Sequence, residues 1–123
     1  MILVDSVGWI EFFTDGPLAT EYAQYLQKPS EVVVPTIVLY EVYKKIKNER
    51  HEEAALVAVA TMQNAQVIPL TEDLSLLAAD MSLNHKLAMA DAIVYASAIQ
   101  QNAKLVTSDK DLKGLPHVIY FPK

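Results

Sequence analysis

Short runs of apolar, mostly β-branched residues alternate along the chain with longer segments in which apolar residues recur every three or four positions. The apolar runs predict five short strands, at residues 1–4, 32–34, 67–68, 104–107 and 118–121. The segments with helical spacing predict six helices, at 7–13, 18–26, 36–46, 52–62, 71–85 and 90–101. Thr36 and Thr71 stand where the third and fifth helices begin, so we expect both to be N-caps.

The order of these elements indicates how they pack. Strands that alternate with helices are typical of a mainly parallel sheet with helices on both faces. Apolar runs without polar alternation indicate strands buried on both faces. We therefore expect an α/β fold, a three-layer α/β/α sandwich with a five-stranded sheet, in one domain spanning residues 1–123. In such sheets ligands bind beyond the carboxyl ends of the strands.

Composition excludes several kinds of site. The 123 residues are 52% hydrophobic, which is enough for a core. The absence of Cys excludes disulfides, a thiolate nucleophile and a Cys-based zinc site. Only Gly8, Gly16 and Gly114 are glycines, and their spacing excludes a phosphate-binding loop and a dinucleotide-binding motif. No apolar run approaches the ~18 residues that a membrane span needs, and Asp5 interrupts the first run. We expect a cytoplasmic protein with no membrane association.

Acidic residues outnumber basic ones by 15 to 10, which disfavours nucleic-acid binding through a broad basic surface. Four of the acids fall at one edge of the predicted sheet. Asp5 and Asp109 follow strands, and Glu41 and Asp91 lie early in helices. Carboxylates in apolar surroundings need partners, and several at one point repel each other. A divalent cation removes that repulsion, and ligands that are all oxygen favour Mg²⁺ or Mn²⁺.

Each of these acids also has a structural interpretation when taken alone. Asp5 and Asp91 are suited to cap a helix or to face its first turn. Glu41 has Lys45 four residues later, a spacing that supports a surface ion pair. Asp109 opens a polar stretch that suits a solvated turn. Their joint placement at one edge of the sheet favours a common site.

Other polar residues in apolar surroundings have structural interpretations. We expect Glu11 on the outer face of its short helix and Asp80 beside an apolar helical stripe. The histidines form no acid–base pair, and each suits the surface or a helix end; they are His51, His85 and His117.

Four segments, in order, resemble one family over essentially the whole chain. They are an apolar strand ending in Asp and Ser (1–6), Val-Pro-Thr with a helical Glu (34–41), a Leu-led approach to Asp-Ala (87–92), and Thr-Ser-Asp-Lys-Asp-Leu (107–112). The chain resembles the PIN-domain ribonucleases and, within them, the VapC toxins of bacterial and archaeal toxin–antitoxin pairs.

The resemblance implies a set of site residues. The metal-binding, catalytic acids would be Asp5, Glu41, Asp91 and Asp109, with Asp111 as an accessory metal ligand. Thr107 would orient Asp109 or a water, and Ser6 would do the same beside Asp5. Val7 stands where many relatives have a second Ser, which departs from the family's pattern.

The resemblance also implies a reaction and partners. The reaction would be RNA hydrolysis by water that Mg²⁺ (or Mn²⁺) activates, with a 5′-phosphate and a 3′-hydroxyl as product ends. A VapB-like antitoxin would block the acidic pocket, and we expect a homodimer. A PIN fold that only binds, without nuclease activity, and a metal-dependent DNA nuclease are the alternatives. A phosphorylatable receiver is excluded because no Asp follows the third strand.

Basic and aromatic clusters leave the RNA contacts open. A basic run ends the helix of Glu41, where it suits either solvation and the helix dipole or RNA contact: Lys44, Lys45, Lys47 and Arg50. Aromatic residues gather in the first two helices, where core packing or an antitoxin groove is favoured over base stacking: Trp9, Phe12, Phe13, Tyr22 and Tyr25. Tyr40 and Tyr43 suit the same roles or a homodimer contact.

Overall fold

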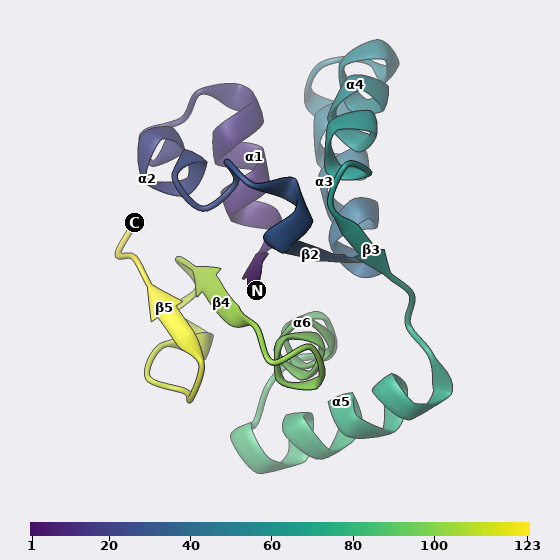
Figure 1. The fold of residues 1–123 in the computed structure, drawn as a ribbon, viewed down its shortest axis with the longest axis vertical. Helices are drawn as coiled ribbons and strands as arrows, with labels where there is room; N and C mark the ends of the chain where they lie inside the picture. Colours follow the sequence, from purple (N-terminus) through teal and green to yellow (C-terminus); the bar gives the residue numbers. More distant parts are fainter.

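Five parallel strands form one sheet in the order β3-β2-β1-β4-β5 (Figure 1). The computed structural model describes residues 1–123, and its strands are β1 (Ile2–Val4), β2 (Val32–Pro35), β3 (Gln66–Ile68), β4 (Lys104–Thr107) and β5 (Val118–Tyr120). At the centre of the sheet, Leu3 of β1 lies opposite Val33 of β2 and Leu105 of β4. The predicted α/β class is confirmed, and the sheet is parallel throughout rather than only mainly so.

Helices cover both faces of this sheet. They are α1 (Ser6–Thr14), α2 (Ala19–Ala23), α3 (Thr36–Glu49), α4 (Glu52–Met62), α5 (Glu72–His85) and α6 (Met89–Gln100), with 3₁₀ turns η1 (Pro29–Glu31) and η2 (Lys110–Leu112). Figure 1 shows α1, α2 and α4 on one side of the sheet and α5 and α6 on the other. None of the helices combines the length and the apolar character needed to cross a membrane.

The core is built from the central strands and one central helix. The apolar side chains of β1, β2 and β4 are fully buried at Leu3, Val33 and Leu105, as continuous apolar strands require. In α6 every residue from 92 to 98 is buried, because the helix lies between the sheet and α5. This burial on all sides explains why α6 carries small and apolar residues around its whole circumference.

Some helix ends differ from the prediction. Thr71 caps α5 as expected, since its hydroxyl accepts a hydrogen bond from the Leu74 amide at 3.2 Å. Thr36 is not an N-cap; it is the first residue of α3, and Pro35 holds the cap position with no side-chain hydrogen bond. The second helix ends at Ala23 rather than residue 26, because the chain tightens into turns closed by i→i+3 bonds.

Candidate active site

The acids that follow β1 and β4 meet because these strands are neighbours in a parallel sheet. Asp5 comes directly after β1 and caps α1, and Asp109 lies two residues after β4 and caps η2. Asp91 stands in the first turn of α6, the helix that leads back into β4. Asp91, Asp109 and Asp111 each offer a carboxylate oxygen within 4.8 Å of the other two. The structure therefore brings three of the predicted acids together at the carboxyl edge of the sheet.

Thr107 connects Asp5 to Asp109. The Asp5 side chain is only 7% exposed. Its Oδ1 accepts a hydrogen bond from the Gly8 amide at 3.0 Å, and its Oδ2 accepts one from the Thr107 hydroxyl. The same hydroxyl oxygen accepts a hydrogen bond from the Asp109 amide at 3.0 Å. One fully buried side chain therefore fixes the positions of two acids.

The pKa values of two acids are raised in this setting. Burial raises the pKa of Asp5 to about 6, although the hydrogen bonds from Thr107 and Gly8 lower it in part. The pKa of Asp91 is raised to about 7, first by burial and then by repulsion from Asp109 and Asp111. None of the ion pairs in the protein reaches these carboxylates; the pairs are Lys45–Glu49, Lys47–Glu52 and Lys123–Glu11. The negative charge at this edge is therefore not compensated by any side-chain cation.

Glu41 lies at the side of this group, on α3. Its half-buried carboxylate has a raised pKa because of desolvation, which a hydrogen bond from the Ser6 side chain partly offsets. Ser6 therefore lies beside Glu41, whereas the hydroxyl that bonds Asp5 is that of Thr107. Lys45 forms its ion pair with Glu49, at 2.7 Å, and not with Glu41. The interpretation of Glu41 as the partner of Lys45 in a surface ion pair is therefore wrong. The charge of Glu41 adds a small part to the raised pKa of Asp5.

A buried tyrosine supports the same edge and has no local signal in the sequence. The Tyr22 hydroxyl and the Ser108 hydroxyl are 2.6 Å apart, and the tyrosine is fully buried. Ser108 stands between Thr107 and Asp109, so this bond ties α2 to the turn that carries Asp109. The Tyr22 ring also packs on Gly8, where an added Cβ would lie only 2.5 Å from it. Because the two hydroxyls are 86 residues apart, no local pattern could predict their contact.

Glu11 is buried, which corrects its expected place on the outer face of α1. Its Oε2 accepts a hydrogen bond from the Leu18 amide at 3.2 Å, and its Oε1 lies 3.8 Å from the Lys123 ammonium. The same carboxylate occupies the space in which a side chain at Gly16 would lie. Glu11 therefore organises the turn between α1 and α2 and does not belong to the acidic group.

A family model of the PIN domain matches residues 2–118. This chain belongs to the PIN domain family. Nucleases of the family hydrolyse phosphodiester bonds and typically depend on divalent metal ions, so the membership supports a nuclease. No curated protein matches the chain in sequence.

Solved structures share the fold of this PIN domain over its whole length. A toxin–antitoxin complex from Klebsiella pneumoniae has a TM-score of 0.82 at 23% identity, covering 97% of this chain and 96% of that one. A sarcin-ricin-loop-cleaving VapC toxin of Mycobacterium tuberculosis has a TM-score of 0.79 at 21% identity, covering 96% and 98%. A VapBC complex of Rickettsia felis, bound to a fragment of its promoter DNA, has a TM-score of 0.75 at 16% identity, covering 98% of both chains. The predicted PIN-like fold is confirmed.

The acids of this PIN domain fit a divalent cation. Every donor in the group is a carboxylate oxygen, which is the ligand type that Mg²⁺ and Mn²⁺ prefer. The buried carboxylate of Asp5 and the crowded carboxylate of Asp91 both have raised pKa values and no cationic partner. A bound cation would reverse both effects by stabilising the ionised forms.

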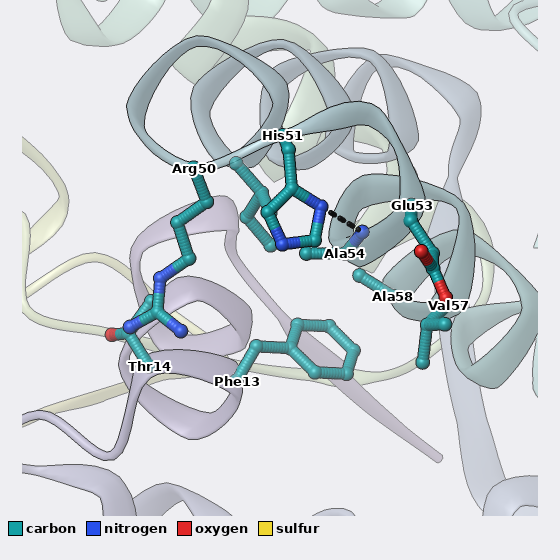
Figure 2. A pocket seen from close by; sticks show the side chains of 9 residues that line it. Phe13, Thr14, Arg50, His51, Glu53, Ala54, Val57 and Ala58 are labelled. Carbon is teal, nitrogen blue, oxygen red and sulfur yellow. Dashed lines mark hydrogen bonds between the residues drawn. The ribbon is translucent and has the colours of Figure 1, made fainter.

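The PIN domain also has an apolar hollow that contains none of these acids. It has a volume of about 380 Å³ and lies between the end of α1 and the α3–α4 junction. Figure 2 shows Phe13 facing Val57 and Ala58 across it, with Arg50 and His51 at its rim. His51 also caps α4, because its Nδ1 accepts a hydrogen bond from the Ala54 amide at 3.1 Å. Its position at a helix end agrees with the structural interpretation of this histidine.

Proposed function

We propose that this PIN domain is an Mg²⁺-dependent endoribonuclease that acts as the toxin of a VapBC-type toxin–antitoxin pair. The observation that carries the proposal is the group of carboxylates at the carboxyl edge of the sheet, which has no side-chain cation to offset its charge. Membership of the PIN family supports phosphodiester hydrolysis, and the fold shared with toxin–antitoxin proteins supports the toxin role.

The residues have distinct tasks in this proposal. The acids that would hold Mg²⁺, or Mn²⁺ in its place, are Asp5, Glu41, Asp91, Asp109 and Asp111, which we call the acidic cluster. Bound there, the ion would lower the pKa of a water and offset charge on the phosphate. Thr107 keeps Asp5 and Asp109 at fixed positions, and Ser6 orients Glu41. No side chain of the protein is needed as the nucleophile, and the expected product ends are a 5′-phosphate and a 3′-hydroxyl.

A VapB-like antitoxin is the protein partner in this proposal. The hollow of Figure 2 supports it, because its floor is apolar at Phe13 and Val57 while Arg50, His51 and Glu53 supply a polar rim. Such a combination suits the apolar face of a helical segment. A basic side chain of the same antitoxin would neutralise the acidic cluster, which has no cation of its own.

A homodimer completes the proposal. Leu76 and Leu83 lie one heptad apart on α5 and are 63% and 80% exposed. Leu70 and Met89 are also exposed and border a hollow between α5 and α6. Exposed apolar side chains gathered on and beside one helix suit an interface between identical copies. Sedimentation velocity checks this, because a dimer of the wild type should become a monomer when Leu76→Glu and Leu83→Glu are combined.

Cleavage of RNA by the purified chain, freed of any antitoxin, tests the nuclease. We expect total RNA to be cut in Mg²⁺ and left intact in EDTA, and Asp5→Ala to remove the activity. Asp80→Ala is the matched control, because Asp80 is an exposed acid on α5 outside the acidic cluster. Single-stranded DNA is tested in parallel. Cleavage that persists in EDTA or in Asp5→Ala would refute the mechanism, and cleavage of DNA alone would make the protein a DNA nuclease. A chain that binds RNA without cutting it would be a binding module.

A further inference from the structure

The exposed face of α3 carries two pairs in which a lysine lies over a tyrosine. The Lys44 ammonium is 5.5 Å from the centre of the Tyr40 ring and 3.3 Å from its hydroxyl. The Lys47 ammonium is 5.3 Å from the centre of the Tyr43 ring and 3.2 Å from its hydroxyl. Tyr40 is 57% exposed, whereas Tyr43 is partly buried and packs against the core. The face therefore presents aromatic surface and positive charge side by side.

Two adjoining hollows run along this face and reach the acidic cluster. The first has a volume of about 540 Å³ and contains Glu41 and Ser6 at one end. The second has a volume of about 570 Å³ and extends to Tyr43 and Lys47. The two share three lining residues, Tyr40, Lys44 and Asn48. We call this continuous depression the α3 groove.

The charge of the α3 groove is available to a ligand. Lys44 forms no ion pair, and its ammonium group makes its hydrogen bond and its aromatic contact with Tyr40. Lys47 is paired with Glu52 at 3.5 Å, but both side chains are about half exposed, so this pair holds the lysine weakly. An anion that enters the groove can therefore bind Lys44 without breaking an ion pair, and Lys47 by breaking only a weak one.

We propose that the α3 groove binds single-stranded RNA and leads it to Glu41 in the acidic cluster. This inference rests on the proposed function and adds to it the path of the substrate. Lysines bind phosphates, and tyrosine rings stack on bases whatever their sequence. A duplex is disfavoured, because its stacked bases offer no free face to the exposed ring of Tyr40.

The dimensions and charges of the molecule agree with this path. Tyr40 to Lys47 spans about 10 Å of helix, so a single strand that lies along the groove would meet both lysines. The chain carries a net charge of −5, so a broad basic face is not available to hold RNA. The acidic cluster repels phosphates until a cation is bound, so affinity must come from residues beside it. The α3 groove has basic and aromatic residues and a candidate acid in one continuous surface.

Steady-state cleavage and direct binding of a defined RNA test the α3 groove. The probe is a fluorescein-labelled RNA of about 12 nucleotides, within the range of known single-strand sites, together with the same strand in a duplex. The test variant combines Lys44→Gln and Lys47→Gln. Its matched control combines Lys28→Gln and Lys104→Gln, since Lys28 precedes β2 and Lys104 begins β4 at the opposite edge of the sheet. All four lysines are exposed, so circular dichroism should report the same fold for both variants.

We expect the test variant to raise KM for the single strand while kcat is retained. The slope of log kcat/KM against log salt should become shallower by about 1.4, since each lost phosphate contact removes about 0.7. Tyr40→Leu should raise KM about tenfold, because a stacked base contributes about that factor, and Tyr40→Phe should recover most of the loss. The control should keep the KM and the salt slope of the wild type.

An unchanged KM and an unchanged salt slope in the test variant would overturn the inference. The α3 groove would then be a surface for a protein partner or would face solvent alone. Duplex RNA bound as tightly as the single strand, with the same dependence on the two lysines, would also overturn it. The proposed function fails separately, if the wild type binds the labelled strand by fluorescence anisotropy but does not cut it in Mg²⁺.

Discussion

Asp91→Asn should stabilise the metal-free protein while it removes nuclease activity. The Asp91 carboxylate lies within 4.8 Å of the Asp109 and Asp111 oxygens, and no basic side chain pairs with it. Asn has almost the same shape but no charge, so it removes the repulsion and leaves the packing of α6 intact. A residue whose role is to bind metal, and not to stabilise the fold, should show both effects when it is replaced: a more stable protein and a loss of activity.

The size of the stabilisation follows from the pKa of Asp91. Its pKa is raised from 3.8 to about 7. A shift of about three units corresponds to ~4 kcal/mol without screening. Because the side chain is partly exposed and solvent screens the repulsion, we discount this to about 1–2 kcal/mol of unfolding free energy. For a chain of this length that change should raise Tm by about 4–8 °C.

The pH dependence fixes the sign of the effect. Above pH 7 the carboxylate is ionised in both folded and unfolded chains, and the folded wild type carries the full repulsion. Between pH 4 and 7 the folded chain holds a proton that the unfolded chain has lost, so wild-type stability falls as pH rises. Below pH 4 both states are protonated. The advantage of Asp91→Asn should therefore be largest near pH 8 and should vanish near pH 3.5.

Thermal unfolding in EDTA and in Mg²⁺ measures this prediction. A cation that binds only the folded wild type adds about 2.7 kcal/mol at a concentration one hundred times its Kd. The wild type should therefore gain Tm in Mg²⁺ and overtake Asp91→Asn, which should gain little. Asp80→Asn, an exposed acid on α5, is the control and should follow the wild type in both buffers. An Asp91→Asn chain that melts at or below the wild type in EDTA at pH 8 would refute the reasoning.

Two further substitutions test the residues that hold the acids in place. Thr107→Val removes the donor to Asp5 and the acceptor of the Asp109 amide. It should cost about 1–3 kcal/mol in urea unfolding and lower cleavage, whereas Thr107→Ser should retain both. Equal stability of the Val and Ser variants would contradict this assignment. Tyr22→Phe removes the bond to Ser108 and should cost about 1–2 kcal/mol. In a double-mutant cycle with Ser108→Ala the two losses should not add, and full additivity would show that the hydroxyls act independently.

The sequence predicts the sheet well because each strand is built around a short apolar run, and the runs alternate with segments of helical spacing. The helix at 52–62 is also predicted to the residue, since an Ala-rich segment of good helix formers lies between His51 and Gln63. The end of α2 is not predicted, because long-range packing decides it. Tyr22 and Tyr25 pack on Phe121, with ring centres 5.5 and 5.8 Å away. No local propensity can include a contact made almost one hundred residues later.

The candidate site is predictable to the extent that topology decides it. Parallel strands deliver Asp5 and Asp109 to the same edge, and the helix before β4 brings Asp91 there, so residue types and order are sufficient. The partners of the acids are not predictable in the same way. Ser6 stands next to Asp5 in sequence but lies beside Glu41, because residue 6 is already the first residue of α1. The direction of the Ser6 side chain depends on the start of α1, and the order of residues in the sequence does not reveal it.

The chain has more acidic than basic residues, yet its proposed substrate is an anion. The positions of the acidic residues explain how both can hold. Setting the four predicted catalytic acids aside leaves 11 of the 15 acidic residues against 10 basic ones, so the rest of the molecule is almost neutral. A nearly neutral surface neither attracts RNA over long distances nor repels it strongly. Local charge must then decide where RNA lies, and Lys44 and Lys47 stand on the same helix as Glu41. A cation bound at the acidic cluster would therefore reduce the negative charge where the α3 groove meets it, and binding of metal and of RNA should be cooperative.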